Sequence, residues 1–192
     1  FAANGEDGIY KHSANRYDQF SIRANLDLKL SKYVSLTYGN TSRYEHTQYP
    51  AKSAGSIFSA IRRSKPTLNA YWPSGEIGPD IEYGDNPAAT STDAAGYNRQ
   101  KNYYIQNNAT LTIQFPWVEG LKLTASGAYD KHFYGEKNFR KPVRLYSWDG
   151  VTRSSEGLKP YDAWISDPQL NQIHRDYTDW LTNAVLSYNR TF

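Results

Sequence analysis

The chain has 192 residues, a net charge of +3 and no cysteine, and 15% of its residues are aromatic, including 17 Tyr and 5 Trp. Without cysteine it has no disulfide framework, thiol nucleophile or Cys-ligated zinc or iron–sulfur site, and its dispersed Lys and Arg residues indicate no nucleic-acid partner. No run approaches the roughly 20 apolar residues of a membrane helix. The mean hydropathy of −0.77 is compatible with a membrane β-barrel, because only every second strand residue there contacts lipid.

The first part of the chain predicts a turn followed by a β-hairpin. Residues 4–8, Asn-Gly-Glu-Asp-Gly, are predicted as a turn. Over residues 20–30 every second side chain is apolar and every intervening one is polar, which predicts a strand with one apolar and one wet face. A second alternating run covers about 34–45. The short break at 31–32 between the two runs indicates an antiparallel hairpin.

The same arrangement recurs in the second half of the chain. Residues 105–115 and 121–130 alternate between apolar and polar side chains, and the short segment 116–120, which contains Pro and Gly, joins them. Residues 182–188 predict a fifth strand with a less regular alternation. About five antiparallel strands are therefore expected.

Two long segments, about 48–102 and 135–175, separate the strand pairs and are rich in Pro, Gly, Ser, Asn and Asp. Within the first, residues 53–63 predict a short helix that ends before Pro66. The short turns fall at one end of the strands and the long segments at the other. Loops of this length are uncommon in compact domains unless they are functional.

Together these features predict an all-β fold: an antiparallel transmembrane β-barrel segment with short periplasmic turns and long extracellular loops. A soluble β-sandwich shows the same alternation, because its two apolar faces pack on each other, but strand length and one-sided loops favour the barrel. Two aromatic bands are expected at its rims. The band near the short turns contains Tyr33, Phe115, Trp117 and Phe192, and the band toward the long loops contains Tyr38, Tyr44, Tyr103, Tyr104, Tyr129, Phe133 and Tyr134.

The barrel interpretation assigns strand residues to two environments, because successive side chains point to opposite faces. The residues expected to face lipid are Ile22, Leu26, Leu28, Leu30, Val34, Leu36, Leu111, Ile113, Leu121, Leu123 and Leu186. Those expected to face the lumen or a plug domain are Arg23, Asp27, Lys29, Lys122, Asp130 and His132.

No constellation of residues indicates catalysis, a metal site or a cofactor, so we expect a protein that is not an enzyme. The four histidines are far apart and match no metal-binding spacing. Asp130 and His132 lie two residues apart on one strand face; they resemble half of a metal site, but polar residues that face a lumen explain them better.

Aromatic residues of the long loops are the better candidates for binding a ligand. Their flat apolar faces and polar edges suit sugar rings, and binding residues concentrate on loops carried by a rigid scaffold. The alternative is that they fold the loops or contact a partner protein. The candidates are Tyr71, Trp72, Tyr83, Trp148, Tyr161 and Trp164.

Several motifs, taken in order, resemble the barrel of SusC/RagA-type TonB-dependent outer-membrane transporters. Gly-Ile-Tyr-Lys at 8–11 precedes an Arg-Ala-Asn-Leu-Asp strand at 23–27, and Tyr-Val-Ser-Leu follows at 33–36. Pro-Thr-Leu-Asn-Ala-Tyr-Trp-Pro-Ser-Gly at 66–75 and Tyr-Asn-Arg-Thr-Phe at 188–192 are also similar to that family. The resemblance covers most of the chain.

The resemblance implies that residues 1–192 form part of the barrel of a larger transporter in the outer membrane of a Gram-negative bacterium, with no plug domain among them and no self-sufficient fold. Such a protein imports oligosaccharides or peptides, takes energy from TonB through its plug, and carries a SusD/RagB-like surface lipoprotein as a lid. The transporter–lipoprotein pairs form a homodimer in contact with outer-membrane lipid. The alternatives are a secreted β-sandwich carbohydrate-binding module and a β-rich glycoside hydrolase fragment.

Overall fold

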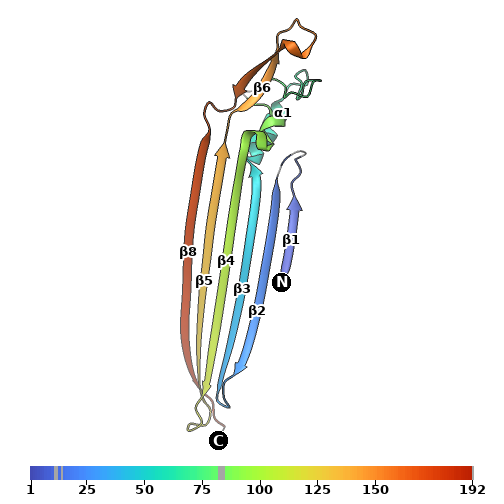
Figure 1. Cartoon of the computed structure of the whole chain (residues 1–192). Coiled ribbons are helices and arrows are strands. Elements are labelled where there is room, and N and C mark those ends of the chain that lie inside the picture. Colours follow the sequence, from blue (N-terminus) through green and yellow to red (C-terminus); the bar gives the residue numbers. More distant parts are fainter. Residues whose placement is uncertain (11–12, 14, 82–84, 192) are drawn as a thin grey trace.

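The computed structural model describes residues 1–10, 13, 15–81 and 85–191. One long antiparallel sheet dominates it, with strand order β1-β2-β3-β4-β5-β8, and a separate hairpin joins β6 to β7 (Figure 1). The strands are β1 (Ala2–Asp7), β2 (Arg16–Lys29), β3 (Val34–Pro50), β4 (Gly96–Gln114), β5 (Leu121–Arg140), β6 (Val143–Trp148), β7 (Leu158–Ala163) and β8 (Gln169–Tyr188).

The helices are short and lie in the loops. Helix α1 (Ala54–Arg63) confirms the predicted helix, and Ser53 caps it by accepting a hydrogen bond from the backbone N–H of Ser56. No helix in the described part of the chain is long and apolar enough to cross a membrane. The other helices are α2 (Pro87–Thr90) and two 3₁₀ turns, η1 (Asp93–Ala95) and η2 (Ser155–Gly157).

The predicted antiparallel β fold is confirmed, but the expected number of about five strands is wrong, because the described residues form eight. The predicted turn at 4–8 is also wrong: Asn4 and Asp7 belong to β1 and pair with Gln19 and Arg16 of β2. Strand β1 has no alternating pattern, and β6 and β7 are six-residue strands inside a long loop. Sequence periodicity therefore gives no signal for these three strands.

The register divides the long sheet into two chemically different faces, because residues paired across an antiparallel ladder share a face. Leu28 pairs with Leu36, and Leu36 pairs with Leu111. One residue further along, Thr37 pairs with Thr110. We call the side that carries the leucine row the apolar face and the side that carries the threonine row the polar face.

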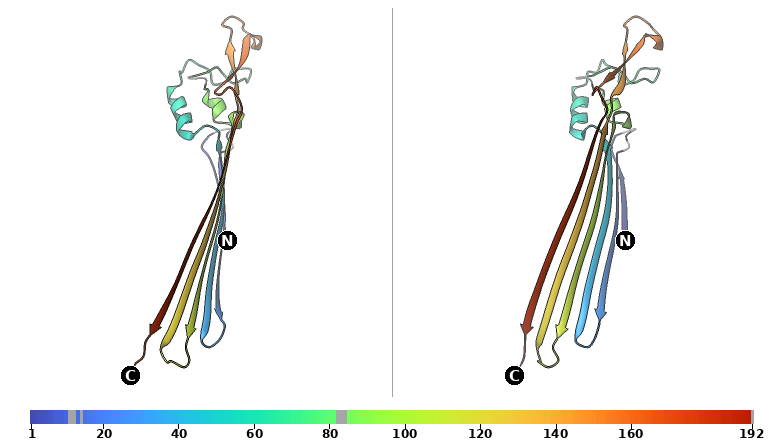
Figure 2. Two further views of the ribbon diagram at one scale, coloured as in Figure 1. Left: turned by 90° about the vertical axis from the view of Figure 1, so that its left-hand side faces the viewer. Right: turned by 60° about the vertical axis from the view of Figure 1, so that its left-hand side comes forward.

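Among the described residues, no second layer covers either face over most of the sheet's length, as the edge-on view shows (Figure 2). Leu26 and Leu186 on the apolar face are 49% and 64% exposed. Strands β1 and β8 are the two edges, so the described strands form an open sheet. The buried hydrophobic residues of the described chain lie in the loops and their hairpin: Ala51, Ile57, Ala89, Ala95, Val143, Leu145 and Ala163.

The connections at the two ends of the sheet differ in length, as the sequence predicts. Short turns join β2 to β3 and β4 to β5 at one end, while residues 51–95 and 141–168 form the long connections at the other (Figure 1). In the second short turn Gly120 has φ +87°, and a Cβ there would lie 2.0 Å from the Asn189 carbonyl oxygen. Only glycine fits this turn.

Candidate ligand-binding site in the long loops

The two long connections pack into one structure beyond the end of the sheet. Its hydrophobic centre combines Ala89 and Ala95 of the first connection with Val143, Leu145 and Ala163 of the β6–β7 hairpin. The side chains of Ile77, Tyr161 and Trp164 pack against this centre. Residues far apart in sequence are thereby held in fixed positions.

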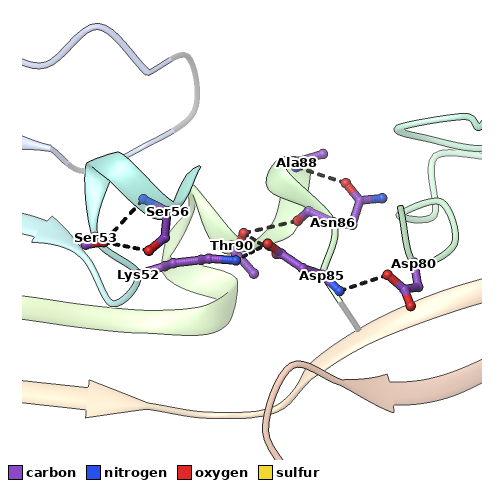
Figure 3. Close-up of polar contacts among 8 residues, drawn as sticks. All are labelled: Lys52, Ser53, Ser56, Asp80, Asp85, Asn86, Ala88 and Thr90. Carbon is purple, nitrogen blue, oxygen red and sulfur yellow. Dashed lines mark hydrogen bonds and ion pairs between the residues drawn. The ribbon is translucent and has the colours of Figure 1, made fainter. Parts of the chain in front are cut away.

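A buried polar network holds the first connection together (Figure 3). The Asn86 side chain is fully buried. Its amide nitrogen donates to the carbonyl oxygens of Gly78 and Pro79, each at 3.2 Å, and its amide oxygen accepts from the backbone N–H of Ala88 at 2.9 Å. Asn86 is thus both the N-cap of α2 and the partner of two carbonyl groups on the preceding turn.

Asp85 joins the start of this connection to its middle. Its carboxylate forms an ion pair with Lys52, just after β3, and accepts a hydrogen bond from the Thr90 hydroxyl at 2.8 Å. Its backbone N–H donates to the Asp80 carboxylate at 3.0 Å. Burial lowers the pKa of the Lys52 ammonium below its ordinary value. The sequence signal for this network is Asn86-Pro87, in which asparagine suits an N-cap and proline suits the first helical position. Taken alone, however, this dipeptide indicates a turn.

A cavity of about 450 Å³, which we call the loop cavity, opens between the two connections. Trp72 and Trp148, two of the predicted ligand-binding residues, both line it. The Trp72 indole N–H donates to the Tyr146 carbonyl at 2.8 Å and that of Trp148 to the Thr152 carbonyl at 2.6 Å. The indole N–H groups are therefore occupied, which leaves the apolar parts of the two rings to contact a ligand. The other lining residues are Asn69, Pro73, Ser74, Thr152, Arg153, Ser154, Ser155 and Leu158.

The turn after Trp148 forms one wall of the loop cavity and is fixed by Asp149. Its carboxylate accepts the Thr152 hydroxyl and the backbone N–H groups of Val151 and Thr152, the latter two at 2.9 and 2.8 Å. These hydrogen bonds, led by the hydroxyl of Thr152, lower the pKa of Asp149 to about 2. Gly157 closes the turn, where a Cβ would lie 2.7 Å from that of Thr152. The wall is therefore preformed at neutral pH.

This arrangement suits the binding of a ligand. Two indole faces offer an apolar surface, and Asn69, Arg153 and Ser154 supply amide, guanidinium and hydroxyl groups around it. Sugar rings need this combination of a flat apolar surface and polar groups that reach hydroxyls. In the described part of the chain, no group of three or more His, Asp or Glu side chains is placed to hold a metal ion.

The other predicted loop aromatics lie elsewhere. The Tyr71 hydroxyl donates to the Ala88 carbonyl at 3.3 Å, and the Tyr161 hydroxyl accepts from the backbone N–H of Asp80 at 2.7 Å. Trp164 packs on the hydrophobic centre of the loops. These three side chains thus contribute to loop folding, and Tyr83 lies outside the described residues.

The register separates the two predicted classes of strand residue. The six residues expected to face the lumen all lie on the polar face: Arg23, Asp27 and Lys29 of β2, and Lys122, Asp130 and His132 of β5. All but one of those expected to face lipid lie on the apolar face: Ile22, Leu26, Leu28, Val34, Leu36, Leu111, Ile113, Leu121, Leu123 and Leu186. The exception, Leu30, follows the end of β2.

The predicted aromatic band near the long loops is divided between the two faces. Tyr44, Tyr103 and Phe133 lie in one row with Phe20 on the apolar face. Tyr104, by contrast, lies on the polar face. Tyr38 and Tyr129 share the apolar face, Tyr134 shares the polar face, and Phe192 of the other predicted band lies outside the described residues.

On the polar face, Tyr104 belongs to a row of stacked flat groups that sequence reasoning missed. The Arg43 guanidinium lies 4.4 Å from the Tyr104 ring centre, and that ring stacks on His132 at 4.2 Å. His132 stacks in turn on Tyr177 at 5.5 Å. Four different strands contribute these residues, so only the register brings them together.

No protein-family model matches the chain, and no curated protein matches it significantly. The similarity to SusC/RagA-type transporters therefore stays a prediction that rests on the motifs of the sequence. The same holds for transport, the partners and the outer-membrane location.

Proposed function

We propose that the chain forms part of the barrel wall of an outer-membrane TonB-dependent transporter that imports oligosaccharides or peptides. The observation that carries this proposal is the uncovered apolar face of the long sheet. On β3 the apolar band runs from Val34 to Tyr44. At about 3.4 Å per residue, this band is about 34 Å long along the strand. A strand tilt of about 40° reduces its height to about 25 Å, which is the height of the lipid-facing band of membrane barrels.

Polar side chains within this band support the proposal because they bond to one another. The amide oxygen of Asn107 accepts from the Tyr38 hydroxyl at 2.7 Å and from the Asn40 amide at 2.8 Å. Lys131, two residues from the aromatic row, reaches Asp176 at 2.6 Å and Thr178 at 2.7 Å. In lipid an unpaired polar group costs several kcal/mol, so such pairing is what a lipid-facing surface requires.

The rim of the band also fits a membrane boundary. The row of Phe20, Tyr44, Tyr103 and Phe133 marks its upper edge, where membrane barrels carry aromatic girdles. The next residues on the same face are polar or charged: Asp18, His46 and Lys101.

The proposal also accounts for the two open edges of the sheet. Every backbone group in lipid needs a partner, so strands β1 and β8 require further strands beside them. Such strands would come from the rest of the transporter. The polar face, with its threonine, asparagine and charged residues, would then line the lumen and meet the plug.

The alternative of a β-sandwich carbohydrate-binding module needs a second sheet on the apolar face. The only other sheet among the described residues, β6–β7, lies beyond the end of the long sheet instead (Figure 1). This position favours the barrel. A lid formed by a SusD/RagB-like lipoprotein would cover the long loops, and TonB would act through the plug.

Fractionation and uptake test the proposal together. We expect the intact protein in the detergent-extracted outer membrane, and we expect uptake of labelled oligosaccharides or peptides to fall when either its gene or TonB is deleted. Recovery as a soluble monomer would favour the binding module. Hydrolysis of a glycan by the purified protein would favour the glycoside hydrolase fragment.

A further inference from the structure

Three cations, which we call the basic patch, lie on the apolar face just beyond its aromatic row. Lys101 and Arg99 lie two and four residues from Tyr103 along β4, so the three side chains share one face. Lys137 of β5 pairs directly with Arg99 and completes the patch. Strands β4 and β5 are interior strands of the sheet (Figure 1), so the basic patch does not lie at an open edge.

The charge of the basic patch is not neutralised within the described structure. Its three side chains are exposed, and no carboxylate of a described residue lies within ion-pair distance of them. Arg16, on the same face of β2, instead forms ion pairs with Asp7 and Asp18. The carboxylates of Glu45 and Glu136 lie near the level of the patch but on the polar face.

The arrangement of the basic patch favours a bound anion. Arg99 and Lys137 are like charges directly opposite each other on neighbouring strands, a pairing that by itself destabilises a sheet. An anion between them replaces this repulsion by two attractions. Lys101 lies opposite Gly135, so no side chain of β5 fills the space in front of its ammonium group.

The Arg99 guanidinium is held in place for such an anion. It lies 4.1 Å from the centre of the Tyr97 ring, and its Nε donates to the Gln48 side-chain oxygen at 3.1 Å. These two contacts leave its terminal amino groups for a ligand. A guanidinium presents its donors as a planar fork that matches phosphate oxygens, and a lysine beside it adds a point charge.

The height of the basic patch matches the headgroup layer of a bilayer. Tyr103 and Phe133 of the aromatic row are 45% and 40% exposed, as expected at the edge of the hydrocarbon. With a strand tilt of about 40°, Lys101 stands about 5 Å above this row and Arg99 and Lys137 about 10 Å above it. The headgroup layer is roughly 5–8 Å thick on each side, and long basic side chains bend to reach it.

We propose that the basic patch binds the phosphate group of a lipid in the outer leaflet, with Arg99 and Lys137 on either side of the phosphate and Lys101 below it. The acyl chains would lie along the apolar face beneath the aromatic row. A free anion has no reason to require this position beside lipid, which is why the proposal commits to a lipid phosphate. It deepens the proposed function by naming a partner of the barrel wall, and it rests on that function.

Phosphatidic acid and diacylglycerol with the same acyl chains differ only in the phosphate, so they test this inference directly. Native mass spectrometry measures their binding to the intact protein, purified from the outer membrane in a neutral detergent. We expect phosphatidic acid to bind roughly tenfold more tightly, and Arg99→Gln to weaken its binding roughly fivefold. Replacing all three residues of the basic patch by glutamine should abolish the preference. Added salt should weaken it in the wild type.

Arg175→Gln is the matched control, because the Arg175 guanidinium also lies over a tyrosine ring, that of Tyr134, but on the polar face of β8. It removes the same charge near the same height and should leave lipid binding unchanged. The triple variant relieves like-charge repulsion and should be recovered in the outer membrane like wild type; if it is not, Arg99→Gln and Lys137→Gln decide the matter.

Three results would overturn the inference: equal binding of the two lipids, equal binding by Arg99→Gln and Arg175→Gln, or displacement of phosphatidic acid by inorganic phosphate at equal concentration. Any of them in a protein recovered from the outer membrane leaves the proposed function standing. Recovery of the wild type as a soluble protein would instead overturn the proposed function and the inference with it.

Discussion

Asn86 lies fully buried between two carbonyl groups, which it satisfies while capping α2. Together with Asp85 and its ion pair to Lys52 it gives a long connection a fixed path without a large hydrophobic core. The loop cavity depends on this path, because Asn69 and Trp72 lie on the segment that Asn86 holds.

Replacing Asn86 by alanine leaves the buried carbonyl of Gly78 without its Asn86 donor, and such a group costs about 1–3 kcal/mol. We expect Asn86→Ala to open this connection and to speed its cleavage in limited proteolysis by roughly 5–150-fold. Asn69→Ala, an exposed asparagine of the same connection, should change the cleavage rate little. Equal rates in the two variants would show that the Asn86 network does not hold the loop.

At the scale of elements, the strands with one apolar face could be predicted from sequence and those without one could not. Alternation finds the central part of β2, but its first residues, from Arg16, are polar on both faces and pair only because β1 and β3 flank them. The same limit applies to the candidate site. The sequence predicts Trp72 and Trp148 as loop aromatics. It does not predict that they meet in one cavity, because that depends on packing between connections about 70 residues apart, which no local pattern encodes.

The two faces of β2 should respond differently to charge. Leu26 lies near the middle of the apolar band, and an arginine at a bilayer midplane costs about 2–4 kcal/mol. We expect Leu26→Arg in the intact protein to reduce the fraction that assembles into SDS-resistant barrel, as seen by heat-dependent electrophoretic mobility. Asn25→Arg, its neighbour on the polar face, should assemble like wild type. Assembly reduced equally by both changes would contradict a lipid-facing apolar side.

At the scale of the whole molecule, the sheet is a single layer whose folded loops gather at one end (Figures 1 and 2). A soluble protein would leave both faces of such a sheet in water, at a large hydrophobic cost on one of them. A membrane removes that cost and gives the two ends different surroundings. In the proposed barrel the long loops would meet the outside, and the short turns would meet the periplasm.

The central claim is that the apolar face contacts lipid while the polar face contacts water. The chain itself has no cysteine, so single cysteines at each position from 20 to 29 can carry a spin label in the intact protein, once any cysteine outside the chain is replaced and the protein is reconstituted in bilayers. Collision with oxygen, which concentrates in lipid, should peak at even positions, and collision with a water-soluble nickel chelate should peak at odd ones. Profiles without this alternation, or nickel access at positions 22, 24 and 26 equal to that at 23, 25 and 27, would contradict the account.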